Sequence, residues 1–167
     1  MPVLLTPSRV IPVTSLTVPL PIDTLFDPAR PLEIEIGCGK GRFLAARAAQ
    51  NPATQYLGIE RMLSRVAKLD KKAGRLKLDN LRILRLEAFY TFYYLLPAHR
   101  VRSVYVFFPD PWPKRHHHNR RLFSPLFLDA LWTRLEIGGT VQIATDHLDY
   151  FAEIRTRFAA DPRFREI

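Results

Sequence analysis

Short apolar runs alternate with segments of helical period along most of the chain. Five runs rich in aliphatic and aromatic residues predict strands at 32–37, 55–60, 81–88, 103–108 and 138–146. Apolar residues spaced three or four positions apart predict helices at 41–50, 61–78, 89–97, from Ser124–Pro125 onward and around Phe151–Phe158. Because strands that alternate with helices need crossover connections, the pattern predicts an α/β fold with a doubly wound, mainly parallel sheet.

Residues 1–31 differ from the rest because they hold seven of the fourteen prolines. Proline fixes φ and lacks a backbone donor, so this N-terminal arm is expected to be extended rather than helical. We expect Val3, Leu4, Leu5 and Ile11 to hold the arm against the domain formed by residues 32–167.

The composition is ordinary for one globular domain, with 47% hydrophobic and 25% charged residues, but the charge is not. A net charge of +9 favours a polyanionic partner, with nucleic acid preferred over a membrane, although a merely basic soluble protein is the alternative. No apolar run is long enough to span a membrane, and the N-terminus lacks the pattern of a signal peptide. The single cysteine, Cys38, excludes an internal disulfide and suits a cytoplasmic location.

The first predicted strand leads into "EIGCGKG", in which Gly37, Gly39 and Gly41 permit a tight turn and close approach of a ligand. The spacing is shorter than in most dinucleotide sites, and a purely structural turn would explain it equally well. Glu35 is an acid within an apolar strand and needs a partner. That partner is either the ammonium group of a ligand or the N–H groups of the turn itself.

Further acids follow the second and third strands. Glu60 lies about 20 residues after the glycine turn, where an acid accepts hydrogen bonds from ribose hydroxyls; capping of the next helix is the alternative. Glu87 ends the third strand and could contact an adenine edge. Two nucleoside cofactors fit, NAD and S-adenosylmethionine, and the acid within strand one together with the short glycine turn favours the methyl donor.

The loop after the fourth strand, "PDPWPKRHHHNRRL", places Asp110 between two prolines that stiffen the backbone. Asp110 is expected to face the reactive group of the cofactor. Four cations without an intervening acid suit phosphates: Lys114, Arg115, Arg120 and Arg121.

Other side chains near this loop allow two interpretations each. Trp112 stacks on a base or packs on the helix that follows. Asp146, after the fifth strand, contacts a base edge or caps the last helix. Three adjacent histidines do not have the spacing of metal ligands, so we expect no metal site at His116–His118.

The predicted helix at 61–78 carries four cations along one face: Arg61, Arg65, Lys68 and Lys72. These cations could widen the positive surface, but a solvated face is the preferred interpretation of the sequence.

Together, "EIGCGKG", "GIE", "PDPWPKRHHHNRRL" and "TD" resemble the bacterial tRNA (guanine-N7-)-methyltransferase family over about residues 32–150. "PDPWPK" is the most specific element. The resemblance implies a Rossmann-like fold, S-adenosyl-L-methionine as cofactor, and methylation of N7 of guanine 46 in the variable loop of tRNA.

The resemblance also implies site residues. Cofactor contacts fall on Glu35, Glu60, Glu87 and Asp110, of which Asp110 is also the catalytic residue. The glycine turn adds Gly37, Gly39 and Gly41 to the expected cofactor-binding residues, because they permit close approach of the ligand. Lys114 and Asp146 would bind the substrate, and His116, His117, His118, Asn119, Arg120 and Arg121 would contact RNA.

The sequence departs from the family pattern at three places. Glu87 stands where Asp or Asn is usual, and His116 and Asn119 stand where basic residues are usual. The chain stops at Ile167, before the strand pair that carries the Thr-x-x-Glu motif of the family, which predicts a C-terminally short domain with an uncovered strand edge.

Two other functions remain open on the sequence alone. The first is a catalytically inactive RNA-binding module on a methyltransferase fold, and the second is a nicotinamide-dependent oxidoreductase. The sequence does not decide between a monomer and a homodimer.

Overall fold

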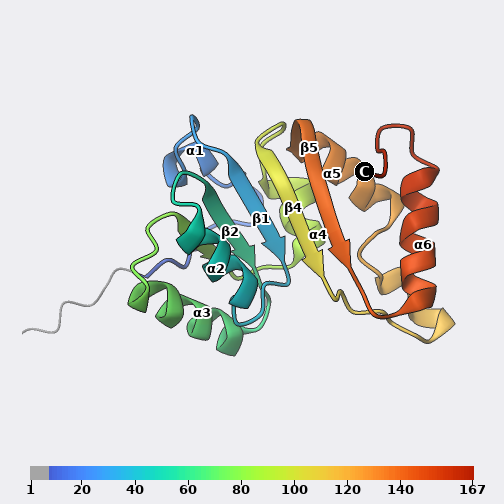
Figure 1. Cartoon of the computed structure of the whole chain (residues 1–167), viewed down its shortest axis with the longest axis horizontal. Coiled ribbons are helices and arrows are strands. Elements are labelled where there is room, and N and C mark those ends of the chain that lie inside the picture. Colours follow the sequence, from blue (N-terminus) through green and yellow to red (C-terminus); the bar gives the residue numbers. More distant parts are fainter. Residues whose placement is uncertain (1–7) are drawn as a thin grey trace, which may run out of the picture.

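The computed structural model describes residues 8–167, so the predicted contacts of Val3, Leu4 and Leu5 lie outside it. Its centre is a sheet of five parallel strands in the order β3-β2-β1-β4-β5 (Figure 1). The chain order reverses between the neighbours β1 and β4, which makes the edge at their carboxyl ends the expected ligand-binding place. The strands are β1 (Leu32–Ile36), β2 (Gln55–Ile59), β3 (Leu81–Leu84), β4 (Val101–Phe107) and β5 (Leu135–Ala144).

Helices cover both faces of the sheet, as the predicted doubly wound fold requires. The helices α2 (Arg42–Gln50) and α3 (Leu63–Arg75) lie over one face (Figure 1). The opposite face is covered by α4 (Ala88–Tyr90), a short π-helix (Thr91–Leu95), α5 (Pro125–Arg134) and α6 (Leu148–Ala159).

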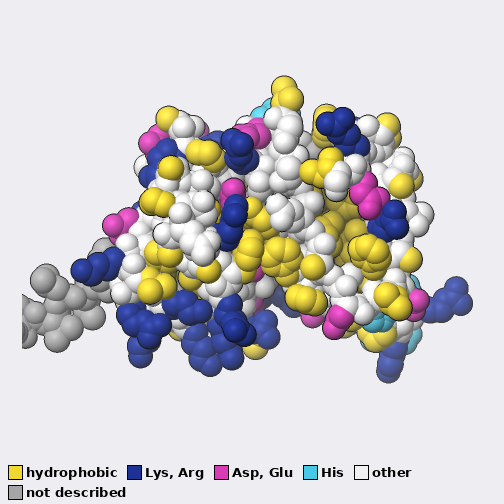
Figure 2. Space-filling model, viewed as in Figure 1, with side chains coloured by type: hydrophobic (Ala, Val, Ile, Leu, Met, Phe, Trp, Pro, Cys, Tyr) yellow, Lys and Arg dark blue, Asp and Glu magenta, His cyan; other side chains and the backbone are white. Residues whose placement is uncertain are grey.

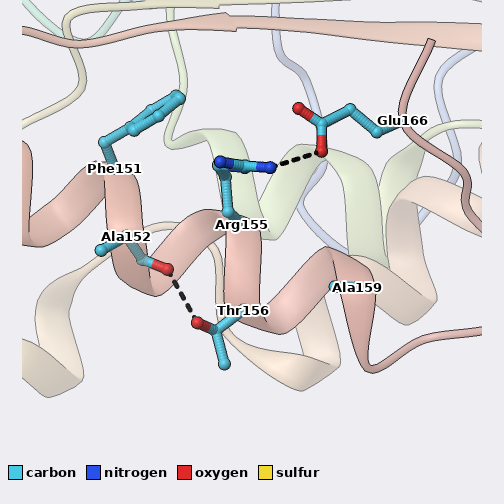
Figure 3. A pocket seen from close by; sticks show the side chains of 6 residues that line it. All are labelled: Phe151, Ala152, Arg155, Thr156, Ala159 and Glu166. Atoms are coloured by element: carbon cyan, nitrogen blue, oxygen red, sulfur yellow. Dashed lines mark hydrogen bonds and ion pairs between the residues drawn. The ribbon is translucent and has the colours of Figure 1, made fainter.

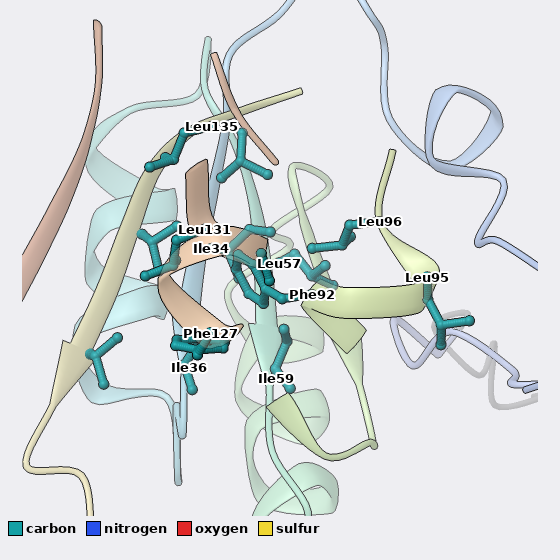
Figure 4. Packing of buried hydrophobic residues seen from close by; sticks show 14 of the residues in the cluster. Ile34, Ile36, Leu57, Ile59, Phe92, Leu95, Leu96, Phe127, Leu131 and Leu135 are labelled. Carbon is teal, nitrogen blue, oxygen red and sulfur yellow. The ribbon is translucent and has the colours of Figure 1, made fainter. Parts of the chain in front are cut away.

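The sheet separates two clusters of buried apolar side chains. Alternate residues of β1 point to opposite faces, so its three aliphatic side chains enter one cluster while its two glutamates face α2. Figure 4 shows this larger cluster, which joins Ile34, Ile36, Leu57, Ile59, Phe92, Phe127 and Leu131. The smaller cluster lies under α2 and α3 and includes Leu44, Tyr56, Val66 and Leu69.

The predicted start of α5 is confirmed. The Ser124 hydroxyl accepts a hydrogen bond from the Phe127 N–H at 3.2 Å, and Pro125 occupies the first helical turn. Proline is favoured there because its missing N–H would have had no partner within the helix.

Two strand boundaries differ from the predictions by three or more residues, and the others differ by at most two. β3 ends at Leu84 instead of 88, because Glu87 caps the following helix. β5 begins at Leu135 instead of 138, and an irregularity in its pairing with β4 leaves Ile137 fully exposed. Neither the bulge nor the cap is visible in apolar periodicity.

The N-terminal arm is mostly extended, but it contains one short helix that was not predicted, α1 (Ile22–Leu25). Val10 pairs in parallel with Ile83, so the arm lies along the outer edge of β3. Ile11, Ile22 and Phe26 are buried in the larger cluster, which confirms the predicted packing of Ile11. Within residues 8–167, none of the helices is both long and apolar enough to cross a membrane.

Candidate functional site

The sequence-predicted acids gather at the carboxyl edge of the sheet because each lies near the end of a parallel strand or after it. Ile36 pairs with Val106, so the glycine turn after β1 and the Asp110 loop after β4 leave neighbouring strands at the same edge. Phe107 pairs with Ala144, which brings Asp146 to this edge as well. Asp110 therefore lies at the same edge of the sheet as the glycine turn, which its predicted role requires.

The glycine turn has left-handed backbone at all three glycines, with φ of 68° at Gly37, 55° at Gly39 and 63° at Gly41. Gly41 must also lack a side chain, because a Cβ atom there would lie 2.1 Å from Cδ1 of Leu69. The turn is thus pressed against α3, and a glycine is needed there both for its backbone and for its lack of a side chain.

Glu60 holds the turn in place from the end of β2. Its Oε2 accepts a hydrogen bond from the Gly39 N–H at 3.0 Å, and its Oε1 accepts one from the Met62 N–H at 2.8 Å. The side chain is buried, and its bond to the Met62 N–H at the start of α3 agrees with the alternative of helix capping, while the ribose contact stays a prediction. Since each carboxylate oxygen has two lone pairs, Glu60 keeps capacity for a further donor.

Of the two buried carboxylates at this edge, those of Glu35 and Glu60, only that of Glu35 has an oxygen without a hydrogen-bond partner among the described residues. Glu35 is 5% exposed, and the oxygen without a partner is its Oε2. Burial raises the pKa of Glu35 to about 8, with the Leu44 backbone N–H opposing the shift. The N–H groups of Gly39 and Gly41 bind Glu60 and the Cys38 carbonyl instead, so the turn does not satisfy Glu35.

Gly58 is a site residue that the sequence analysis did not single out. A Cβ atom there would lie 2.7 Å from Leu44 Cδ2 and 2.8 Å from Cys38 Sγ. Gly58 therefore lets the glycine turn and α2 lie close against β2. The signal was present, because a glycine inside a strand marks close backbone approach.

Burial, with the nearby Glu35 and Glu60 carboxylates, raises the pKa of the Cys38 thiol, so this thiol is not reactive.

The loop that presents Asp110 is strained on both sides. Phe108 and Trp112 have φ of 52° and 43°, values that residues other than glycine adopt rarely. Asp110 itself is exposed, while Pro109 and Pro111 beside it are partly buried. The two unusual backbones and the prolines together fix the direction in which the carboxylate leaves the sheet.

Arg121 anchors this loop from within the protein. Its Nε donates to the Pro111 carbonyl at 2.8 Å, its Nη1 pairs with Glu153 of α6, and its guanidinium lies over the Tyr150 ring at 4.7 Å. Only 5% of Arg121 is exposed. The structure therefore gives Arg121 a role within the fold, in contrast to the RNA contact that the resemblance implies.

The remaining cations of the loop are on the surface. Residues Arg115–Arg120 form a 3-10 helix, which was not predicted, and Lys114 precedes it. The Arg120 guanidinium lies 5.0 Å from the centre of the Trp112 ring, and His117 contacts the same ring edge to face. Trp112 thus packs against residues of this unpredicted 3-10 helix instead of the predicted helix at Ser124, and the base-stacking interpretation stays a prediction.

The last two predicted acids have different surroundings. The Glu87 carboxylate accepts hydrogen bonds from the N–H groups of Phe89 at 3.0 Å and Tyr90 at 2.7 Å, and so caps α4. Asp146 is exposed, and His147 caps α6 in its place by accepting from the Tyr150 N–H. The interpretation of Asp146 as the cap of the last helix is therefore wrong, and its side chain faces solvent at the carboxyl edge.

A shallow hollow on α6 is separate from this edge (Figure 3). Its lining includes Phe151, Thr156 and the ion pair between Arg155 and Glu166, and it contains none of the predicted site residues. In the described part of the chain, no group of three His, Cys, Asp or Glu side chains could hold a metal ion.

Residues 29–167 match the family model Methyltransf_4, described as "Putative methyltransferase". The chain is 41% identical over 143 residues to a Halorhodospira halophila protein named tRNA (guanine-N(7)-)-methyltransferase, covering 86% of this chain and 62% of that protein. A Nocardia farcinica protein of the same name is 42% identical over 144 residues, covering 86% of this chain and 54% of the relative. The chain thus spans somewhat over half the length of these relatives.

Solved structures of methyltransferases share the fold. The 16S rRNA methyltransferase KamB superposes with a TM-score of 0.62 at 19% identity, over 83% of this chain and 72% of that one. A SAM-dependent O-methyltransferase from Thermotoga maritima gives a TM-score of 0.61 at 16% identity, over 84% of this chain and 48% of that one. The predicted Rossmann-like methyltransferase fold is confirmed.

Proposed function

Because the chain belongs to the Methyltransf_4 family, we propose that it transfers a methyl group from S-adenosyl-L-methionine to N7 of guanine 46 in tRNA. The observation that carries the proposal is the unpartnered, buried oxygen of Glu35 beside a glycine turn, on the same sheet edge as Asp110. A tRNA substrate, together with a lone buried cysteine, also fits a cytoplasmic enzyme.

The residues of the carboxyl edge fit the methyl donor in chemical type. Glu35 offers a carboxylate oxygen to the donor's ammonium group, and the exposed Gly37 lets the ligand approach the backbone closely. Glu60 keeps lone pairs for the ribose hydroxyls, and Glu87 lies after β3 for the adenine edge. Gly39 and Gly41 shape the turn. The bound donor supplies an electrophilic methyl group on a sulfonium.

Guanine N7 carries an in-plane lone pair and needs no prior deprotonation, so the protein's task is to place the base. Asp110 leaves the sheet on a stiff loop and is the residue that orients the guanine through a hydrogen bond. Lys114 holds the nucleotide, and the exposed Asp146 contacts the base edge from β5. In this scheme Asp110 is a positioning and polarising group instead of a strong base.

The segment after Lys114 contacts the RNA backbone. His116, His117, His118, Asn119 and Arg120 occupy one short 3-10 helix beside the site, and their side chains suit phosphates and bases. We leave Arg121 out of this contact set because its guanidinium is buried against Pro111, Glu153 and Tyr150.

The two other functions find no support. The relatives described above are named as enzymes, which argues against an inactive RNA-binding module. Membership of a methyltransferase family overturns the nicotinamide-dependent alternative.

Incubation of the chain with an unmodified tRNA transcript and methyl-labelled donor tests the proposal directly. We expect label on N7 of guanine 46, and no label on a transcript in which that guanine is replaced by adenine. Binding of tRNA and cofactor without label transfer would contradict the proposed activity.

A further inference from the structure

A row of cations follows one face of α3 and is not part of the site described above. Positions 65, 68, 72 and 75 are separated by three or four residues, which aligns them at 100° per residue along one side of the helix, and Arg61 lies just before the N-cap Met62. From Arg65 to Arg75 the row is about 15 Å long. We call Arg61, Arg65, Lys68, Lys72 and Arg75 the α3 ridge.

The buried residues of α3 lie on a different side of the helix from the ridge. Val66, Leu69 and Ala73 are buried against the sheet. Asp70, the one acid in α3, is turned toward the N-terminal arm and accepts hydrogen bonds from the Ser8 hydroxyl and the Arg9 N–H, both at 2.9 Å. No acid of α3 therefore neutralises the ridge.

Two members of the ridge connect it to the cofactor turn. The Lys72 ammonium donates to the carbonyl oxygens of Lys40 at 3.0 Å and Gly41 at 3.4 Å. Arg65 lies 3.6 Å from the Glu60 carboxylate, which itself binds Gly39. The ridge is thus fixed in position relative to the glycine turn.

The three other cations on α3 have no ionic partner among the residues that the structure describes. Lys68 and Arg75, and Lys71 beside the ridge, are exposed and make no ion pair or side-chain hydrogen bond with any of residues 8–167. Each is therefore available to an external anion.

The ridge weakens the isolated helix. Like charges three or four residues apart destabilise a helix by about 0.2–0.5 kcal/mol per pair. The first turn of α3 has no acid, and its N-cap, Met62, makes no side-chain capping bond. A helix face kept only for solubility would mix both signs of charge. Arg65 has its counter-charge in Glu60, and the uniform sign of the remaining cations indicates that their counter-charges come from a partner.

The ridge and the 114–120 segment bracket the carboxyl edge. Figure 2 shows Lys and Arg side chains gathered along the lower side of the molecule, over α3 in the orientation of Figure 1. Residues 115–120 lie at the lower right of the same view, with the carboxyl ends of the strands between the two. An extended polyanion that crosses the edge would meet cations on both sides.

We propose that the α3 ridge is a second RNA-docking surface, which binds the phosphate backbone of a tRNA arm while residues 114–120 hold the methylated loop. This proposal rests on the proposed function. A membrane surface is the less favoured partner, because the apolar side of α3 is buried in the core and has no face left to enter lipid.

Neutralising the unpartnered cations tests the ridge. The ridge variant carries Lys68→Gln, Lys71→Gln and Arg75→Gln and so loses three positive charges. The control variant loses three exposed positive charges distant from the glycine turn through Arg102→Gln, Arg155→Gln and Arg165→Gln. The readout is the Kd for full-length tRNA over a series of salt concentrations. We expect the ridge variant to bind about 10-fold more weakly, and its log Kd to depend on log salt with a slope smaller by about 2. The control should remain close to wild type.

Three further arms separate the possible outcomes. A short RNA that carries the target guanine but cannot reach α3 should bind wild type and ridge variant alike, and cofactor affinity should be unchanged. Equal losses in ridge and control variants would overturn the ridge proposal, as would ridge-dependent binding to vesicles of anionic lipid with no effect on tRNA. If wild type transfers no methyl group to tRNA, the proposed function fails instead.

Discussion

Glu33 and Glu35 lie two residues apart on the same buried face of β1, yet among residues 8–167 only Glu33 has charged and hydroxyl partners. The Glu33 carboxylate accepts hydrogen bonds from Arg47 at 3.0 Å and from the Tyr105 hydroxyl at 2.9 Å. The Oε2 atom of Glu35 has no partner in the described residues. One acid thus has its partners within the fold, whereas the other keeps an oxygen for the proposed contact with the cofactor.

Glu35→Gln should weaken cofactor binding by about 30-fold or more, because loss of one partner of a buried charged pair costs about 2–5 kcal/mol. Titration calorimetry with the methyl donor measures the effect. Glu33→Gln is the matched control, and it should lower thermal stability while leaving cofactor affinity near wild type. An unchanged affinity in Glu35→Gln would refute the assigned contact.

The stability of the cofactor-free protein should fall as pH rises from about 4.5 to about 8, through the titration of Glu35. The pKa of Glu35 is about 8 in the folded protein, against an ordinary value of 4.5, so over this range the folded state binds the extra proton. The sign is therefore a loss of stability with rising pH. Glu35→Gln should remove this loss, on the order of 3 kcal/mol at pH 8. Urea unfolding at pH 4.5 and pH 8 measures the free energy of unfolding of wild type and variant. If Glu35→Gln changed that free energy equally at both pH values, Glu35 would not be the titrating group.

Gly41→Ala should destabilise the protein by about 2–4 kcal/mol, because it adds a clash with Leu69 to the strain of a left-handed backbone. Gly37→Ala isolates the backbone strain, since Gly37 has a similar φ and no atom within 4 Å of the added methyl group. We expect about 1 kcal/mol from that control. Denaturant midpoints of the two variants should differ clearly, and equal midpoints would mean that Leu69 adjusts freely.

Asp110→Asn should lower the methylation rate by about 100-fold while the affinities for tRNA and cofactor stay near wild type. Asparagine keeps the size of the side chain but changes the hydrogen bond that orients the guanine, and small misplacements of a reacting group cost rate on this scale. Single-turnover kinetics at saturating tRNA and cofactor separate rate from binding. Turnover at the wild-type level would exclude the assigned role.

Arg120→Gln and Arg121→Gln should affect different properties although the residues are adjacent. Arg121 is buried against Pro111, Glu153 and Tyr150, so its replacement should cost about 2–4 kcal/mol of stability. Arg120 is exposed, and its replacement should weaken tRNA binding with little effect on unfolding. Thermal denaturation and tRNA titration of both variants distinguish them; a tRNA defect without destabilisation in Arg121→Gln would reverse our assignment.

The amino-acid sequence by itself determined the order of strands and helices and the edge at which the site lies. The apolar runs of β1, β2 and β4 have the period of buried strands, and parallel strands bring their carboxyl ends to one edge whatever the details of packing. Glu35, Glu60 and Asp110 could therefore be assigned to one site from the order of the chain alone. The motif "PDPWPK" indicated the family because its residues are contiguous, so that no tertiary structure is needed to recognise it.

Only the tertiary structure decided which of these polar groups already have partners. Arg121 and Arg120 are equivalent in sequence, but Glu153 and Tyr150 of α6 bury one and not the other. Glu33 and Glu35 are likewise equivalent until Arg47 and Tyr105 reach Glu33. Periodicity is a local property of the chain, whereas the satisfaction of a buried polar atom depends on segments far apart in sequence that meet only when the sheet has formed.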